Sequence, residues 1–263
     1  MSEKIHPTAL IDPSAELGRD VEVGPYCVIG PHVRIGARTK LISHVFVEKW
    51  ASLGEDNTFF PFVTLGTPPQ DISYKGEETW LEIGDRNTIR EHASMQRGTV
   101  RGRSKTKIGS GCYFMAQSHV AHDCIVADNV ILAQGAVLGG HVQVAEHVIF
   151  GGLAAVHQYC RIGRHAFIGG LSAVVADVIP YGSAFGVHAH LAGLNVIGMR
   201  RRNFSRETIH DLRAAYRLLF AEEGTFQERL EDAAQIYADR PEVMEIVEFV
   251  RAEANRPLCM PRD

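Results

Sequence analysis

The stretch VADNVILAQGAVLGGHVQVAEHVIFGGLAAVHQYCRIGRHAFIGGLSAV, residues 126–174, has a large apolar side chain at every sixth position. The same spacing reaches back to residue 108 and, in a phase shifted by one residue, governs residues 5–65 and 83–95. The apolar positions are Ile5, Ile11, Leu17, Val23, Ile29, Ile35, Leu41, Val47, Leu53, Phe59, Leu65, Ile83, Ile89, Met95, Ile108, Phe114, Val120, Val126, Leu132, Leu138, Val144, Phe150, Val156, Ile162, Ile168 and Val174. A period of six fits neither an α-helix nor a simple alternating strand, so it indicates a repeat architecture.

We interpret this repeat as a parallel β-helix, in which each short strand turns one apolar side chain into a shared core. Glycine often follows the apolar residue, where we expect it to relieve steric strain at a corner. These glycines are Gly18, Gly24, Gly30, Gly36, Gly54, Gly84, Gly109, Gly139, Gly151, Gly163 and Gly169. The pattern resembles the left-handed β-helix of the hexapeptide-repeat transferases, in which three hexads make one triangular coil. The resemblance implies about nine coils stacked about 4.8 Å apart, which is a prism about 40 Å long.

Two segments interrupt the repeat and are predicted to loop outward. Residues 67–80 contain paired prolines and place Asp71 and Glu77 where the period requires apolar residues. Residues 97–107, RGTVRGRSKTK, carry five basic residues with no acid and cause the change of phase. A solvated loop would explain such a run, and so would a docking surface for an acidic partner.

After Val174 the period decays and becomes helical, which predicts a β-helical domain over residues 1–186 and a helical domain over residues 187–263. Ser205 precedes an amphipathic pattern that runs to residue 220, and Thr225 with Glu228 forms a capping-box pattern. Pro241 can begin a third helix. The predicted fold class is therefore mainly β, with a C-terminal α-helical domain that packs on the prism or on a neighbouring subunit.

Composition and charge favour a cytoplasmic enzyme subunit. The net charge is only −4, so bulk electrostatics predicts neither nucleic-acid binding nor attraction to an anionic membrane. The five cysteines lack CxxC spacing, which suits reduced thiols that serve as small apolar filler. The repeat begins at Ile5 and leaves no room for a signal sequence, and no apolar run is long enough to span a bilayer.

Four histidines of the later coils, His119, His122, His141 and His157, are spaced so that they can share one face of the stack. A lone histidine is usually a hydrogen-bonded surface residue, but for four on neighbouring coils a functional site is an equal alternative. Two chemistries compete for them. One is a metal site made of imidazoles, and the other is acid–base catalysis by a single imidazole.

The segments around these histidines resemble the family of acyl-carrier-protein-dependent UDP-N-acetylglucosamine acyltransferases, which open lipid A synthesis. The resemblance covers nearly the whole chain, including the helical tail. It rests on Ser118–Cys124 (SHVAHDC), Leu138–Val142 (LGGHV), Ala155–Gly163 (AVHQYCRIG), Ile83–Asn87 (IGDRN), Arg97–Thr99 (RGT) and Met199–Glu207 (MRRRNFSRE).

That resemblance implies a set of roles. His122 would be the general base, Asp123 would orient its ring, and the backbone N–H of Gly140 would stabilise an oxyanion. Contacts to the acceptor sugar or acyl chain would come from Gln70, Asp71, His119, His141, His157 and Gln158. Nucleotide and phosphate would be held by Asn195, Arg201 and Arg202, with a further substrate contact from His188. A small residue at Gly170 would leave the acyl groove long, so a long 3-hydroxyacyl donor is expected.

The same resemblance implies the partners. The acyl chain would come as a thioester of acyl carrier protein, a co-substrate, and would go to the 3-position of a UDP-sugar, without a metal or other cofactor. The prisms of this family associate as homotrimers with sites between subunits. The sequence by itself shows only a long rod whose flat faces could pack.

Several positions depart from the family pattern around the expected acceptor site. The family commonly has histidine where Gln96 stands, lysine where Ser73 stands and glutamate where Ile197 stands, and Lys75 could compensate for the second change. A 3-amino sugar nucleotide is therefore a second candidate acceptor. Because an amine is more nucleophilic than an alcohol, it would need the base mainly after attack.

Other functions fit parts of the pattern. A zinc carbonic anhydrase on the same prism would use histidines from two subunits, but it needs neither the helical tail nor the triple arginine at residues 200–202. A coenzyme A-dependent sugar acetyltransferase is the nearer enzymatic alternative, and a non-catalytic scaffold is the structural one. The N-acyltransferase that acts later in lipid A synthesis has an extra amino-terminal domain, whereas here the repeat begins at Ile5.

Overall fold

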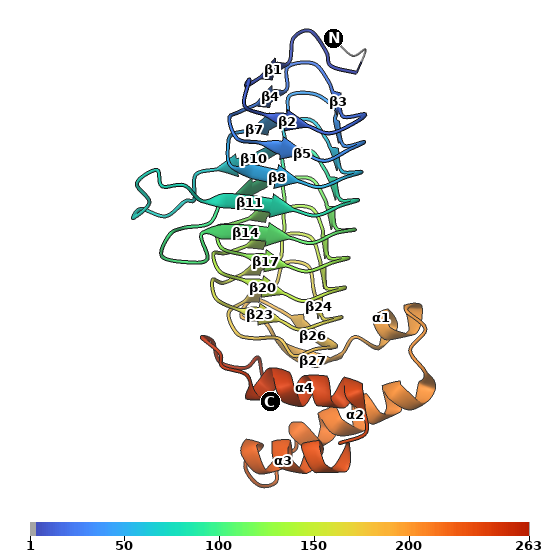
Figure 1. Ribbon diagram of the computed structural model, residues 1–263. Helices are drawn as coiled ribbons and strands as arrows, with labels where there is room; N and C mark the ends of the chain where they lie inside the picture. Colours follow the sequence, from blue (N-terminus) through green and yellow to red (C-terminus); the bar gives the residue numbers. More distant parts are fainter. Residues whose placement is uncertain (1–3, 263) are drawn as a thin grey trace.

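A computed structural model describes residues 4–262 of the chain, so the predicted domain limits at residues 1 and 263 lie just outside the described residues. The chain winds into a left-handed parallel β-helix with a triangular cross-section, followed by helices at its C-terminal end (Figure 1). Successive coils pair 18 residues apart where no loop intervenes, as in Leu10 with Val28 and Ile149 with Phe167. The predicted fold class is confirmed.

Each face of the prism is one stacked sheet. The first face consists of β1 (Leu10–Ile11), β4 (Val28–Ile29), β7 (Phe46–Val47), β10 (Thr64–Thr67), β13 (Ser94–Gln96), β16 (His119–Val120), β19 (Val137–Leu138), β22 (Ala155–Val156) and β25 (Ala173–Val174). The second face consists of β2 (Glu16–Leu17), β5 (Arg34–Ile35), β8 (Ala51–Leu53), β11 (Trp80–Ile83), β14 (Lys105–Ile108), β17 (Ile125–Val126), β20 (Gln143–Val144) and β23 (Arg161–Ile162).

The third face is continued by a hairpin at its C-terminal end. It consists of β3 (Glu22–Val23), β6 (Lys40–Leu41), β9 (Thr58–Phe59), β12 (Thr88–Ile89), β15 (Tyr113–Phe114), β18 (Ile131–Leu132), β21 (Ile149–Phe150), β24 (Phe167–Ile168), β26 (Gly182–Phe185) and β27 (His190–Leu194). The last pair, β26 with β27, is antiparallel. The predicted domain boundary after residue 186 falls in the turn between these two strands.

The core contains two inward side chains per hexad, where the sequence predicted one. The large residue that ends each short strand is buried from Val23 onward, and a smaller buried residue stands two positions before it. Four of the five cysteines occupy this second position: Cys27, Cys112, Cys124 and Cys160. All five cysteines are free and buried, which agrees with their predicted use as filler.

The corners are formed by residues in the left-handed backbone region, three positions after the large core residue. Most of them are not glycine, as at His44, Asp123 and His141. The glycines that follow the core residue serve another purpose, because none of those named from the sequence has a positive φ in the described chain. A Cβ at Gly24 would overlap the carbonyl oxygen of Ile42 on the next coil. Close approach of coils, and not strain at a corner, therefore explains these glycines.

Both interruptions of the repeat leave the prism on the same side, between the first and second faces (Figure 1). One runs from the end of β10 to β11, and the other from β13 to β14. The second loop ends earlier than predicted, because residues 105–107 pair with β11 as part of β14.

Four helices follow the prism: α1 (Val196–Arg201), α2 (Arg206–Leu219), α3 (Phe226–Ile236) and α4 (Pro241–Arg251). The three predicted starts are confirmed. Ser205 caps α2, Thr225 and Glu228 form a capping box on α3, and Pro241 is at the first turn of α4. The short helix α1, capped by Asn195, was not predicted.

Polar contacts join the last helix to the prism. Arg161 Nε lies 2.6 Å from Asp177 Oδ2, and the guanidinium of Arg161 lies over the ring of Phe249 at 4.4 Å. The hydroxyl of Tyr181 donates to the carboxylate of Glu245. The helices are therefore fixed to the final coils.

A column of stacked rings supports the corner between the second and third faces. His147 stacks on His165 with ring centroids 4.8 Å apart, His165 stacks on Tyr181, and Phe204 meets His165 edge-on. His165 is only 3% exposed, and burial lowers its pKa to about 3. The structure therefore favours a neutral ring at this position.

We expect His165→Phe to make the stability of the protein less sensitive to acid. The pKa of His165 is about 3 when folded and roughly 6.5 when unfolded, so the unfolded state binds the extra proton between these values. Stability is therefore greatest above about pH 6.5 and falls as the pH is lowered toward 3. Denaturant unfolding at pH 7 and pH 5, at one protein concentration, should show a smaller loss for the variant than for the wild type. An equal loss in both proteins would contradict the account.

Candidate active site

The catalytic candidates His122 and Asp123 lie at the corner between β16 and β17, which joins the first and second faces. Asp123 is itself the left-handed corner residue, with φ of 60°. His122 Nδ1 lies 2.9 Å from Asp123 Oδ2. A carboxylate can only accept hydrogen bonds, so the proton of the neutral ring is on Nδ1, and Nε2 is left free to accept a proton.

Asp123 is completely buried, and its carboxylate is held by the loop between β13 and β14. Thr99 donates to it from its hydroxyl, at 2.7 Å, and from its backbone N–H, at 3.0 Å. The backbone N–H of Arg103 donates at 2.7 Å. Burial by itself raises the pKa of Asp123, but the hydrogen bonds from His122, Thr99 and Arg103 outweigh it and hold the pKa below its ordinary value. Asp123 is therefore a carboxylate whose position is fixed.

The basic segment 97–107 is divided, because Arg101, Lys105 and Lys107 are exposed as a solvated or docking loop requires, whereas Arg97 and Arg103 contact other parts of the chain. Arg97 is fully buried, and it donates to the carbonyl oxygen of Gly66 at 2.7 Å and to the hydroxyl of Tyr74 at 3.0 Å. Arg103 donates from Nη1 to the carbonyl oxygen of Asp123 at 2.7 Å. Arg97 and Arg103 thus hold the backbone and side chains around the site, a role that the charge of the segment did not predict.

His141 and Gly140 stand one coil further on at the same corner. His141 meets the ring of His122 edge-on at 5.2 Å and stacks on Tyr159 at 4.4 Å. Burial lowers the pKa of His141 and so favours its neutral form. A Cβ on Gly140 would lie 2.6 Å from Cε1 of His122, so only glycine leaves room for that imidazole. Tyr159 was not singled out from the sequence.

His119 and His157 complete the predicted histidine group. His119 is on the outer side of β16, where its Nδ1 lies 2.8 Å from Ser94 Oγ, and burial lowers its pKa. His157 follows β22 at the same corner as His122, and it is exposed. Its Nδ1 lies 2.8 Å from a guanidinium nitrogen of Arg256, a residue that sequence reasoning did not find.

Gln70 and Asp71 lie in the loop between β10 and β11. The backbone N–H of Gln70 donates to Gln96 Oε1 at 3.2 Å. Gln96 departs from the family pattern, and its side chain thus helps to hold Gln70, a predicted substrate contact, in place. Asp71 accepts from the backbone N–H of Ser73 at 2.8 Å. This bond is the main reason that the pKa of Asp71 is lowered, and nearby His122 lowers it further.

Asn195, Arg201 and Arg202 lie elsewhere, beside a cavity of about 420 Å³ between α1 and the third face. Asn195 caps α1 and donates from Nδ2 to the carbonyl oxygen of His165 at 2.9 Å. Arg202 donates to the carbonyl oxygen of His147 at 3.2 Å. These contacts belong to the corner between the second and third faces. A single chain therefore does not bring this group to the corner that holds His122.

Gly170 and His188 are also remote from His122. Gly170 lies between β24 and β25, at the corner between the third and first faces, where a Cβ would lie 3.2 Å from the carbonyl oxygen of Gly152. His188 is exposed in the turn between β26 and β27. The predicted residues thus fall into separate groups on the three corners of the prism.

The side chains of His122, Asp123 and His141 offer ligand atoms within 4.8 Å of one another, so a metal site has to be weighed. Asp123 Oδ2 already accepts from Thr99 and His122, and Oδ1 accepts from Arg103. The Nδ1 atom of His122 points at this carboxylate. A zinc ion would have to displace these hydrogen bonds to gain ligands, so the donor set fits an aspartate–histidine pair better than a zinc centre.

Comparison with known proteins identifies similar chains. A family model described as Udp N-acetylglucosamine O-acyltransferase; Domain 2 matches residues 177–259, and a model of bacterial transferase hexapeptide repeats matches residues 4–37 and 105–140. The acyl-[acyl-carrier-protein]–UDP-N-acetylglucosamine O-acyltransferase of Caulobacter vibrioides is 60% identical over 257 residues, which cover 98% of this chain and 98% of the relative.

Solved structures are similar over the same length. The structure of LpxA from Acinetobacter baumannii is 45% identical, covers 99% of this chain and 100% of its own, and gives a TM-score of 0.94. The UDP-N-acetylglucosamine acyltransferase of Francisella novicida is 31% identical, covers 98% of this chain and 95% of its own, and gives a TM-score of 0.95.

We expect the purified protein to contain far less than one zinc ion per chain, because the carboxylate and imidazole of the cluster are already hydrogen-bonded to each other. Elemental analysis of protein prepared without chelators, with and without prior incubation in zinc followed by gel filtration, measures this. Stoichiometric zinc that disappears in His141→Ala would show that the cluster is a metal centre.

Proposed function

Because the chain belongs to the family of acyl-[acyl-carrier-protein]–UDP-N-acetylglucosamine O-acyltransferases, we propose that its Asp123–His122 pair supplies the base for acyl transfer. The chain is an acyltransferase that moves an acyl group from acyl carrier protein to UDP-N-acetylglucosamine in lipid A synthesis. What we add is the assignment of steps to residues, together with the assembly and the surfaces that complete the site.

In the proposed reaction, His122 Nε2 takes the proton of the sugar 3-hydroxyl as its oxygen attacks the thioester carbonyl. Asp123 stabilises the imidazolium that forms. When the tetrahedral intermediate collapses, the carbon–sulfur bond breaks and the departing thiolate takes the proton from Nε2. The observation that carries the proposal is the buried carboxylate of Asp123, which faces Nδ1 and leaves Nε2 free.

Gly140 is the proposed oxyanion donor. Its position against the imidazole of His122 places its backbone beside the reacting atoms. Across residues 4–262 its N–H donates to no protein acceptor, whereas the neighbouring N–H groups of Gly139 and His141 are both engaged in coil-to-coil hydrogen bonds. An unengaged N–H beside the base is the feature that an oxyanion requires.

We also propose a homotrimer in which one subunit supplies the His122 corner and its neighbour supplies the rest of the site. The separation of Asn195, Arg201 and Arg202 from His122 within one chain supports this arrangement. The first face supports it too, because its outward residues are uncharged: Leu10, Val28, Phe46, Thr64, Ser94, His119, Val137, Ala155 and Ala173. An uncharged face of a rod is suited to packing on a second copy.

The donor and location follow from the family. We propose a long 3-hydroxyacyl chain, since Gly170 and Gly152 place no side chain at their own positions of this corner, and a cytoplasmic location, supported by five free and buried thiols. Within residues 4–262, the helices are all too short or too polar to cross a bilayer.

The hydroxyl acceptor is favoured over the 3-amino sugar, because the site holds a positioned base, which an alcohol needs for attack. Of the three departures that suggested an amine, Gln96 has a local role, since its Oε1 accepts from the backbone N–H of Gln70, whereas Ser73 contributes only a backbone N–H that any such residue supplies. The third, Ile197, is 66% exposed beside the nucleotide cavity. Comparing UDP-N-acetylglucosamine with its 3-amino analogue in one assay decides between them.

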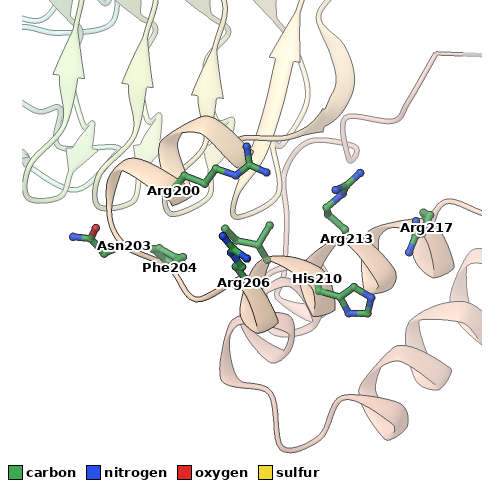
Figure 2. A pocket seen from close by; sticks show the side chains of 8 residues that line it. Arg200, Asn203, Phe204, Arg206, His210, Arg213 and Arg217 are labelled. Atoms are coloured by element: carbon green, nitrogen blue, oxygen red, sulfur yellow. The ribbon is translucent and has the colours of Figure 1, made fainter.

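The triple arginine is divided by α1, and this division suggests where the carrier protein docks. Arg201 and Arg202 line the cavity beside Asn195, whereas Arg200 lines a separate hollow of about 790 Å³ together with residues of α2 (Figure 2). The basic residues of this hollow are Arg200, Arg206, His210, Arg213 and Arg217.

We define this hollow as the arginine groove and propose it as the docking surface for acyl carrier protein. Phe204 and Ile209 give it an apolar floor, and no carboxylate is among its lining residues. In the described chain none of its four arginines is within salt-bridge distance of an acid. An unneutralised basic groove complements an acidic partner that carries a phosphate-linked thioester.

We predict that His122→Ala lowers kcat by a factor of roughly 10² to 10⁴, because general-base catalysis is lost. Asp123→Asn should also lower kcat, since an amide cannot support the imidazolium. Steady-state assays with acyl carrier protein and UDP-N-acetylglucosamine measure both. As a control, light scattering should give three times 29.0 kDa for wild type and His122→Ala alike. Wild-type turnover by a trimeric His122→Ala would remove His122 from this role.

The double variant Arg206→Ala, Arg213→Ala should raise KM for the acyl carrier protein by roughly tenfold and flatten its dependence on salt. Turnover of an acyl-pantetheine thioester, which lacks the protein, should change little. Arg34→Ala, on the second face, is the matched control. If KM for the carrier protein and its salt dependence stay at wild-type values, the arginine groove is not the docking surface.

A further inference from the structure

A C-terminal arginine reaches back to the candidate active site. Arg256 follows α4, yet its Nη2 lies 2.8 Å from Nδ1 of His157, and its Nε donates to the carbonyl oxygen of Gln158 at 3.0 Å. The guanidinium of Arg256 therefore contacts a ring nitrogen of His157 and the adjacent backbone carbonyl at the same time. Both contacts are about 98 residues away along the chain, so they depend on the folded position of the tail.

The tail that carries Arg256 is pinned to the last coils. Asp177 N–H donates to the carbonyl oxygen of Pro257 at 2.8 Å, and Cys259 N–H donates to the carbonyl oxygen of Asp177 at the same distance. Leu191 N–H donates to the carbonyl oxygen of Met260 at 2.9 Å. These bonds follow Arg256 directly in the chain, so its guanidinium is presented from an anchored segment.

The contact fixes the tautomer of His157. Arginine stays protonated in proteins and can only donate, so Nδ1 of His157 must accept, and the ring proton must be on Nε2. The alternative partner of Nδ1 is the carbonyl oxygen of Gln158, 3.1 Å away, which could be bonded only by an Nδ1–H tautomer. An Nδ1–H proton would face the N–H of Arg256 Nη2, so the contact disfavours that tautomer.

His122 and His157 therefore adopt opposite neutral tautomers, because His122 contacts a negatively charged neighbour, Asp123, and His157 contacts a positively charged one, Arg256. Asp123 accepts from His122 Nδ1 and leaves Nε2 as an acceptor, whereas Arg256 donates to His157 Nδ1 and leaves Nε2–H as a donor. Both rings stand at the corner between the first and second faces. A base and a neutral hydrogen-bond donor therefore line the same edge of the prism.

We propose that Arg256 is a positioning residue that sets His157 as an Nε2–H donor toward an oxygen of the bound acyl-transfer substrates. The inference rests on the proposed function, which places substrate at this corner. It assigns to His157 a donor role that His122 cannot share, and it gives the C-terminal tail a part in the reaction.

Long-range ¹H–¹⁵N correlation spectra of the ¹⁵N-histidine-labelled, full-length protein test the tautomer directly. The signals of His157 are identified by their loss in His157→Gln. We expect the Nε2–H pattern in the wild type and in Arg256→Lys, and the Nδ1–H pattern, or a mixture of the two, in Arg256→Gln. Arg251→Gln is the matched control, since Arg251 pairs with Glu231 on the helices and should leave the spectrum unchanged.

Steady-state kinetics test the consequence. Arg256→Gln should lower kcat/KM by roughly three- to tenfold, the range for loss of one hydrogen bond from a neutral donor, and Arg256→Lys should restore part of it. In a His157→Gln background the same substitution should have little further effect, because its action passes through that ring. Thermal melting of each variant verifies that the tail stays folded.

An Nδ1–H tautomer in the wild type, or additive effects of Arg256→Gln and His157→Gln on kcat/KM, would overturn the proposal. Failure of the proposed function looks different. In that case His157→Gln and His122→Ala would both leave acyl transfer unchanged, whatever tautomer the spectra report.

Discussion

The structure depends on the burial of one carboxylate. Asp123 is inaccessible to solvent at a corner of the prism, where an ionised group is strongly destabilising unless its oxygens are hydrogen-bonded. Within the repeat, His122 is the donor that the carboxylate finds at this corner, and one donor does not satisfy two buried oxygens. The loop between β13 and β14 supplies the further donors through Thr99 and Arg103. The loop that breaks the six-residue period is therefore what allows an ionised carboxylate to be buried at this corner.

The regular coils then place further side chains beside this fixed carboxylate, and together they form the candidate site. Residues at equivalent corner positions of successive coils lie above one another, so Asp123, His141 and Tyr159 form a column. The side chain of His122, held by Asp123, meets this column edge-on. The corner between the second and third faces repeats the arrangement with His147 and His165, whose carbonyl oxygens hold Arg202 and Asn195. A prism with three such corners distributes a site over its edges, and association of prisms can then bring the parts together.

The six-residue period predicted the β-helix, and the capping residues predicted three helices, because both signals are local. The second inward position, two residues before each large one, escaped notice because it holds small residues of mixed polarity, among them alanine, cysteine, valine, threonine and asparagine. The short helix α1 lacks a distinct pattern. The inward use of Arg97 and Arg103 and the reach of Arg256 to His157 depend on tertiary contacts, so charge and spacing along the chain could not reveal them. The roles of His122, Asp123 and Gly140 came from a family resemblance, because the orientation of a ring and the freedom of an N–H are set by contacts between coils and not by the local sequence.

The central claim is that Asp123 leaves Nε2 of His122 free to take a proton from the acceptor hydroxyl. A crystal structure of the protein with UDP-N-acetylglucosamine bound measures this most directly. The account predicts that the 3-hydroxyl oxygen lies roughly 2.6–3.2 Å from Nε2 of His122, with Nδ1 still facing Asp123. A bound sugar whose 3-hydroxyl is out of reach of that nitrogen, or an imidazole turned away from Asp123 to hold a metal ion, would contradict it.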